Sequence, residues 1–401
     1  AHRAFPWESE ARGKAHVHVV IIGFGPTDVP AKFITDYDTD LEHPTCTQVA
    51  NINPYLVEGS DRCMPKRREP ICPCEPMIYG SKPVDGGHLI LSRKEKLQLL
   101  AECPDAAKFV RRFHGSEEFI NGIERWCLWL AEAQPEQWRN LAPIRERVEK
   151  VRKFRRSSVK GKTVEQAEQP SIFGELRQPK TSYLAIPEVS SETRRYIPVG
   201  FVKAGVIASN LLYTVPNASL YTFAILTSHM HMAWMRYTAG RLESRYRYSA
   251  GLVYNNFPWP LSPTSEQRET IEKAGQTVLD VRARFSTSTF ADLYDPVAMP
   301  AALAKAHATL DRAVDRCYRK EPFESDRQRV EYLFQLYEQI TAPLAPTVKP
   351  KRSARRKALY SAYPFIPASM TDPVPNADQA VAEAGQCYFI SEEPPPYRTN
   401  T

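Results

Sequence analysis

The chain has 401 residues, of which 42% are hydrophobic and 25% are charged, and its formal net charge is +7. This composition is that of an ordinary globular protein and excludes a wholly disordered chain, a collagen and a simple coiled coil. At roughly 150 residues per domain, the length predicts two or three domains. The mild positive charge permits a polyanionic partner without proving one.

Cysteine usage and hydropathy point to a reducing compartment. The eight cysteines form no disulfide framework and lack zinc-site spacing, so we expect reduced thiols. The sequence has no apolar stretch of about 18 residues and no signal peptide. We therefore expect a soluble, cytoplasmic protein that has no membrane partner. Because the chain opens without methionine, we also expect it to be a piece of a longer protein.

The first element expected along the chain is a buried strand at residues 16–24, where apolar and β-branched residues follow one another. Too little sequence precedes it to form a sheet, so we expect most of its partner strands to lie outside this chain. Gly23 and Gly25 follow, but Asp28 occupies the third glycine position of a dinucleotide fingerprint. A turn is therefore expected there.

The next regions differ in composition. Residues 40–92 are rich in Pro, Gly and Cys and predict irregular structure with short strands. Residues 93–138 carry a helical pattern. Pro143 then begins a basic helix, because residues 145–162 hold nine cations and two carboxylates. Such one-sided charge favours phosphate contact over the alternative of a solvated helix face. The candidate phosphate-binding residues are Arg152, Lys153, Arg155 and Arg156.

Short strands are expected between residues 171 and 216, followed by one helix at 218–239 that is capped by Asn217 and ends at Gly240. Three helices are expected in the last folded part, at residues 265–284, 300–319 and 325–340. On the second of these, His307, Asp311 and Asp315 share one face, and we expect them to form a surface charge cluster. The region after residue 341 is Pro-rich and basic and predicts a mobile tail.

The sequence assigns no catalytic residue and no metal ligand. Enzymes that methylate DNA amino groups hold the flipped base with a polar residue, two prolines and an aromatic residue. The segment at residues 53–55 has only one proline, and the segment at 256–259 has the parts in the wrong order. We expect both to be structural turns.

The most informative segment, residues 232–260, interleaves aromatic, polar and basic side chains after the expected helix end. Glu243 and Arg245 are two residues apart, so in an extended segment they lie on the same side. A carboxylate accepts from the cytosine amino group, and a guanidinium donates to guanine O6 and N7. The pair is therefore a candidate reader of one C·G pair, with a surface salt bridge as the alternative. Arg247 is a further candidate phosphate contact.

Several long segments in chain order resemble the C-terminal half of the MmeI-like (type IIL) restriction–modification and adenine-specific DNA methyltransferase family. They include Gly115-Ser-Glu-Glu-Phe-Ile-Asn-Gly122, Met230-His-Met-Ala-Trp-Met-Arg236 and Tyr254-Asn-Asn-Phe-Pro-Trp-Pro260. Further matching segments are residues 53–57, 67–68, 86–89, 125–130, 190–192, 240–242 and 246–249. The resemblance runs from about residue 1 to residue 345. In the family, the positions of Glu243 and Arg245 change between Glu-x-Arg and Lys-x-Asp with the recognised base pair, which favours base contact.

The resemblance implies an α+β fold with three parts. Residues 1–56 would be the last strands of a Rossmann-like methyltransferase sheet, 57–262 a mixed α/β target recognition domain and 263–345 a C-terminal helical domain. Residues 346–401 lie outside the resemblance, and their basic, Pro-rich composition predicts a disordered tail. The expected partners are double-stranded DNA and upstream methyltransferase and nuclease domains. The resemblance implies S-adenosylmethionine as the cofactor of the full-length protein. The family's cofactor-binding and catalytic motifs have no counterpart in this sequence, so no cofactor is expected in this chain. The alternatives are a stand-alone DNA-binding module without catalysis and an RNA-binding protein.

Overall fold

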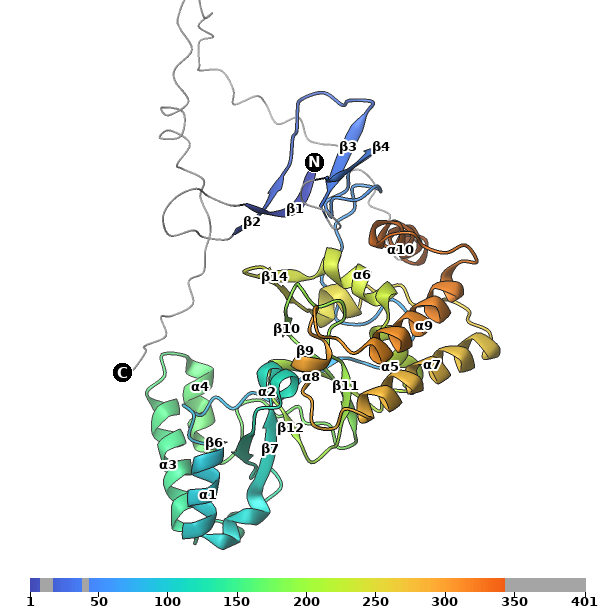
Figure 1. Ribbon diagram of the computed structural model, residues 1–401. Coiled ribbons are helices and arrows are strands. Elements are labelled where there is room, and N and C mark those ends of the chain that lie inside the picture. The colour runs from blue at the N-terminus through green and yellow to red at the C-terminus, as the bar shows by residue number, and fades with distance from the viewer. Residues whose placement is uncertain (8–16, 38–42, 343–401) are drawn as a thin grey trace, which may run out of the picture. The chain divides into compact units, whose positions relative to one another are not determined.

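The N-terminal part of the protein forms its own sheet. The computed structural model describes residues 1–7, 17–37 and 43–342, and Figure 1 shows their arrangement. The first sheet has the strand order β2-β1-β3-β4, in which β1 and β3 are parallel and the other pairs are antiparallel. Its strands are β1 (His2–Trp7), β2 (Val17–Ile21), β3 (Lys32–Asp36) and β4 (Thr45–Val49).

This sheet corrects two expectations for the segment at residues 16–24. Its partner strands lie within the chain, since β2 pairs with β1 and the sheet continues to β3 and β4. The strand is also an edge strand instead of a buried one, and Val20 and Ile21 are 50% and 47% exposed. The apolar composition of this segment therefore predicted more burial than the strand has.

A second part, built around a small sheet and a basic helix, has a separate hydrophobic core. The sheet order is β12-β7-β8-β6, and the core includes Leu91, Phe113, Trp129 and Val148. Its strands are β6 (Ile90–Ser92), β7 (Val110–His114), β8 (Arg125–Leu128) and β12 (Ile207–Ala208). Its helices are α1 (Arg93–Glu102), α2 (Ser116–Asn121), α3 (Ala142–Arg156) and α4 (Gly161–Glu165), with 3₁₀ turns at Pro104–Phe109, Pro135–Gln137 and Gln166–Glu168.

The central antiparallel sheet has the order β11-β9-β13-β5. Side chains alternate across a strand, and β9 uses both of its faces: Leu184 and Ile186 enter the largest core, whereas Tyr183 and Ala185 enter a smaller one. The strands are β5 (Ile78–Tyr79), β9 (Tyr183–Pro187), β11 (Gly200–Val202) and β13 (Leu212–Pro216).

Two helices replace the single helix expected at residues 218–239. They are α5 (Leu220–Leu226) and α6 (His229–Thr238). Ser219 caps the first, and Ser228 caps the second by accepting a hydrogen bond from the His231 amide. The apolar spacing continues through both helices, but Ser228 favours a new helix start over an interior position. The expected Asn217 cap is thus wrong.

The helices after residue 263 confirm the expected pattern. They are α7 (Ser265–Ala283), the short α8 (Phe290–Leu293), α9 (Ala301–Tyr318) and α10 (Asp326–Thr341). Thr264 and Ser325 cap α7 and α10 with their side chains. The largest core joins these helices to α5 and α6, because Leu310 and Val330 belong to the same cluster as Trp234.

The acidic cluster on α9 is part of this core and does not lie on the surface as expected. His307 is fully buried, and Asp311 and Asp315 are only 6% and 8% exposed. Each has a buried partner: Tyr294 contacts His307, Tyr196 donates to Asp311, and Arg329 pairs with Asp315. A buried charge needs such a partner, and the partner of Asp311 comes from a distant part of the sequence.

Two further expectations concern the whole chain. Among the described residues, no helix is long and apolar enough to cross a membrane. The cysteines in this part of the chain are free thiols, namely Cys46, Cys63, Cys72, Cys74, Cys103, Cys127 and Cys317. The expected basic tail and Cys387 lie outside the described residues.

Candidate nucleic-acid interface

The segment that carries Glu243 and Arg245 is a short β-hairpin. It consists of β14 (Gly240–Leu242) and β15 (Arg245–Arg247), which pair antiparallel, with Leu242 opposite Arg245. A two-residue turn therefore joins the strands. β15 also pairs with β10 (Val189–Ser190) on its other side. We call residues 240–247 the reading hairpin.

Glu243 lies in the turn and has a left-handed backbone conformation, with φ at +56°. The expectation that Glu243 and Arg245 share one side of an extended segment is therefore wrong in its geometry. Their side chains nevertheless meet, because the turn folds back: Arg245 Nη2 lies 2.8 Å from Glu243 Oε2. A non-glycine residue in this region carries a backbone cost of about 1 kcal/mol or more, and such residues cluster at functional sites.

The ion pair at the tip is open to solvent. The Glu243 side chain is 76% exposed and that of Arg245 is 46% exposed. An exposed ion pair contributes only about 0–1 kcal/mol, so separating the two groups costs little. The tip thus places one strong hydrogen-bond acceptor, the Glu243 carboxylate, beside one strong donor, the Arg245 guanidinium. Both groups are available to a binding partner that offers a donor and an acceptor side by side.

The reading hairpin is held by carboxylates from neighbouring segments. Ser244 in the turn donates to Glu192 over 2.7 Å. Arg247 Nε donates to Glu188 over 3.0 Å, and this hydrogen bond raises the pKa of the Arg247 guanidinium. Arg247 remains more than half exposed, whereas Glu188 is buried. The hairpin frame is therefore fixed although its tip is exposed.

The basic helix α3 does not present all four of its candidate cations. Arg155 is 1% exposed, and its guanidinium donates to the carbonyl oxygens of residues 83, 84, 166, 169 and 172 over 2.7–3.1 Å. The prediction that Arg155 contacts phosphate is therefore wrong. The residue instead ties two chain segments to the helix, which is a structural role.

The other three candidates of α3 do face solvent. Lys153 and Arg156 are exposed, and Arg152 is partly exposed. Arg152 pairs with Glu149 over 2.7 Å, and Arg156 lies 3.5 Å from Glu168. Both contacts are exposed pairs of the kind that exchange readily for a phosphate. The geometry is compatible with phosphate contact at Arg152, Lys153 and Arg156 and leaves that prediction open.

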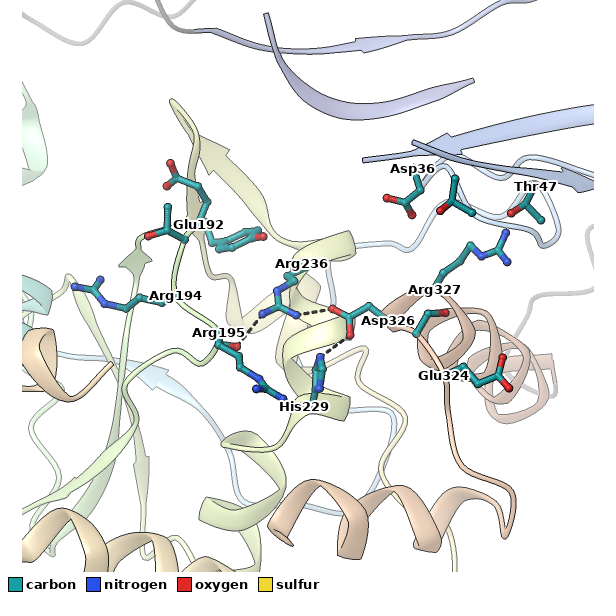
Figure 2. Close-up of a pocket in the computed structure, with 14 residues that line it drawn as sticks. Asp36, Thr47, Glu192, Arg194, Arg195, His229, Arg236, Glu324, Asp326 and Arg327 are labelled. Atoms are coloured by element: carbon teal, nitrogen blue, oxygen red, sulfur yellow. Dashed lines mark hydrogen bonds and ion pairs between the residues drawn. The ribbon is translucent and has the colours of Figure 1, made fainter. Parts of the chain in front are cut away.

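A cleft of about 830 Å³ adjoins the reading hairpin, with Tyr246 of β15 in its wall. Figure 2 shows that His229 and Arg236, both on α6, point toward the carboxylate of Asp326 at the start of α10. Nε2 of His229 and Nη1 of Arg236 each lie 2.5 Å from that carboxylate. Burial disfavours the charged form, but the hydrogen bond from His229 and the charge of Arg236 hold the pKa of Asp326 below its ordinary value. Asp326 lies far from His229 and Arg236 in the sequence, so no local sequence pattern predicted this cluster.

The asparagines of the two near-motifs serve structural turns, as expected. Asn53 accepts hydrogen bonds from the amides of Tyr55 and Val57. Asn256 is fully buried, and its amide donates to carbonyl oxygens of residues 65, 251 and 252. Neither amide is directed at an open base pocket. Among the described residues, no group of three His, Cys, Asp or Glu side chains is placed to hold a metal ion.

Comparisons with known proteins agree with this arrangement. Residues 58–261 match the family model of the MmeI target recognition domain, and residues 263–345 match that of the MmeI C-terminal domain. DNA methyltransferase A of Bacillus subtilis (strain 168) is 39% identical over 341 residues, which are 85% of this chain and 38% of the relative. The solved type IIL restriction–modification enzyme MmeI in complex with DNA is 44% identical with a TM-score of 0.78, over 85% of this chain and 45% of that chain. This chain therefore spans less than half of either relative, and it belongs to the MmeI family, whose target recognition and C-terminal domains it carries.

Proposed function

We propose that this chain is the sequence-reading part of a site-specific DNA adenine-N6 methyltransferase of a restriction–modification system. Double-stranded DNA is the partner, and the reading hairpin enters its major groove. Glu243 accepts from a cytosine amino group, and Arg245 donates to the paired guanine. The observation that carries the proposal is the exposed acceptor–donor pair on a hairpin that Glu188 and Glu192, on either side of β10, hold in place.

Phosphate contacts complete the proposed interface. Arg152, Lys153 and Arg156 on α3, together with Arg247 at the end of the reading hairpin, offer cations that are at least partly exposed. Such contacts set position and affinity but carry no sequence information, whereas the base edges are read by the hairpin. Helix α3 is thus assigned to phosphate contact alone, whereas the reading hairpin carries the base readers and one phosphate contact.

The remaining parts of the full-length protein follow from the family. We assign residues 1–56 to the end of a methyltransferase domain, 57–262 to target recognition and 263–345 to a helical domain. Upstream domains would supply catalysis in the cytoplasm, with S-adenosylmethionine as the methyl donor. No residue of the chain is assigned to it.

Site selection from a randomised duplex pool tests the base-reading role. In the full-length protein, we would combine Glu243→Lys with Arg245→Asp. Lys donates to guanine and Asp accepts from cytosine, so the double variant should prefer G·C where the parent prefers C·G. Each single variant should bind both sequences poorly, because one of its two groups then faces a like group on the base edge.

Preferences at the other positions of the site serve as the internal control, and they should stay unchanged. A double variant that keeps the parental base at every position would refute base reading by this pair. An even loss of preference across the whole site would refute it as well, and would leave Glu243 and Arg245 as a surface salt bridge.

A further inference from the structure

The reading hairpin is a direct continuation of α6. The helix ends at Thr238, and β14 begins at Gly240, so only Ala239 separates them. A rotation or shift of α6 therefore moves the hairpin with it. The position of the hairpin in the groove depends on what holds α6.

The C-terminal helices hold α6 at both ends. At its start, the His229 amide donates to Asp311 of α9 over 2.7 Å. Two turns later, Arg236 donates to Asp326 of α10, and His229 reaches the same carboxylate from the same helix face. Figure 2 shows these two contacts meeting at Asp326. Arg236 also donates a hydrogen bond of 2.8 Å to the carbonyl oxygen of Arg195. Arg195 lies three residues after Glu192, which accepts the hydrogen bond from Ser244 in the turn of the reading hairpin.

The Asp326 contact is shielded and has a rigid base. The side chains of His229, Arg236 and Asp326 are only 16–19% exposed, so solvent screens their attraction weakly. The helix that carries Asp326 is fixed to α9 by the buried pair of Arg329 and Asp315, whose atoms are 2.7 Å apart. A chain of charged contacts thus runs from the helical core through Asp326 to α6.

We propose that Asp326 is a positioning residue for sequence recognition, acting through Arg236 to set the register of the reading hairpin against the DNA. The C-terminal helical region then contributes to specificity without touching a base. This inference rests on the proposed function of Glu243 and Arg245. It extends that function to a residue that is 81 positions from the nearer of the two in the sequence.

The test measures specific and nonspecific DNA binding of the full-length protein with Asp326→Asn, a change that keeps the side-chain shape and removes the charge. We expect the preference at the base pair read by the hairpin to fall about tenfold, the size of one base contact. Affinity for duplexes that lack the site, and its salt dependence, should change little, because three of the four proposed phosphate contacts lie on α3. A protein that was merely destabilised would lose both kinds of binding together.

Two further variants sharpen the test. Glu331→Gln removes a carboxylate of the same helix that pairs with Arg327 inside α10, and it should leave the base preference intact. Arg236→Lys keeps the charge but loses the planar fork, and it should reproduce the Asp326→Asn effect. The combined Asp326→Asn and Arg236→Lys variant should be no worse than either alone, since both act through one contact.

The outcomes separate the two hypotheses. If the parent selects a site and Asp326→Asn and Arg236→Lys select it equally well, the positioning role is overturned while base reading stands. Additive losses in the combined variant would also overturn it, because independent contacts add. If the parent enriches no sequence at all, the proposed function fails, and the positioning role fails with it.

Discussion

Replacing Arg155 by Lys tests whether this cation of α3 is structural. The Arg155 guanidinium makes five hydrogen bonds to five backbone carbonyls, in the segments at residues 83–84 and 166–172. Lysine keeps the positive charge but has only three donors. At least two of these charge-assisted hydrogen bonds are therefore lost, although the carbonyls of Pro83, Gln166 and Gln169 each keep a bond from a backbone amide.

The size of the effect follows from that count. A hydrogen bond from a charged donor contributes about 1.5–3 kcal/mol, so losing two of them costs about 3–6 kcal/mol. Because Arg155 is only 1% exposed, water cannot readily replace the missing donors. Against a typical domain stability of about 5–15 kcal/mol, this loss is large.

Urea unfolding, combined with hydrogen exchange at residues 164–175, measures the loss and shows where it occurs. Lys153→Met is the matched control, because it removes an exposed cation two residues away on the same helix and should change stability by less than about 0.5 kcal/mol. The reasoning is refuted if Arg155→Lys is as stable as the parent. The phosphate role would return if that stable variant also bound all duplexes more weakly.

Three further predictions concern charge, backbone strain and pH. Changing Arg152, Lys153 and Arg156 to Ala should lower the slope of log affinity against log salt by about 0.9 for each phosphate that is no longer bound, and an unchanged slope would leave a solvated helix face. Glu243→Gly should be more stable to urea than Glu243→Ala by about 1 kcal/mol, because glycine relieves the left-handed φ; equal stabilities would contradict the strain. Burial lowers the pKa of His231 from 6.5 to about 3, so the unfolded state takes up a proton first and stability falls as pH drops through this window. His231→Gln should therefore reduce the pH dependence of the unfolding free energy there by up to about 1.4 kcal/mol per pH unit, and parallel curves would argue against a buried neutral histidine.

The sequence predicted those features that depend on neighbouring residues. For α7, the capping residue Thr264 directly precedes a run of apolar residues at helical spacing, and the helix lies where it was expected. Arg155 shows the limit of a charge count. It follows Ile144, Val148 and Val151 at intervals of four, three and four, so helical periodicity places it on the buried face. That spacing was visible in the sequence and outweighs the basic composition around it.

Other features depend on contacts that no local pattern contains. The turn of the reading hairpin holds Glu243 and Ser244, neither of which is a typical residue for a tight hairpin turn, so the sequence suggested an extended segment instead. The meeting of Arg236 and Asp326 joins positions 90 residues apart. Tertiary packing decides both, and only the folded chain shows that the base-reading candidates share a frame with the C-terminal helices.

The exposed tip of the reading hairpin has a consequence for how such proteins diverge. Glu243 and Arg245 project beyond the frame held by Glu188 and Glu192, and neither belongs to a hydrophobic core. Exchanging one polar or charged residue for another at the two positions should therefore change the free energy of unfolding little. If the pair reads DNA as proposed, a lineage can change its target sequence by altering two codons. No compensating mutation in the protein core is then needed.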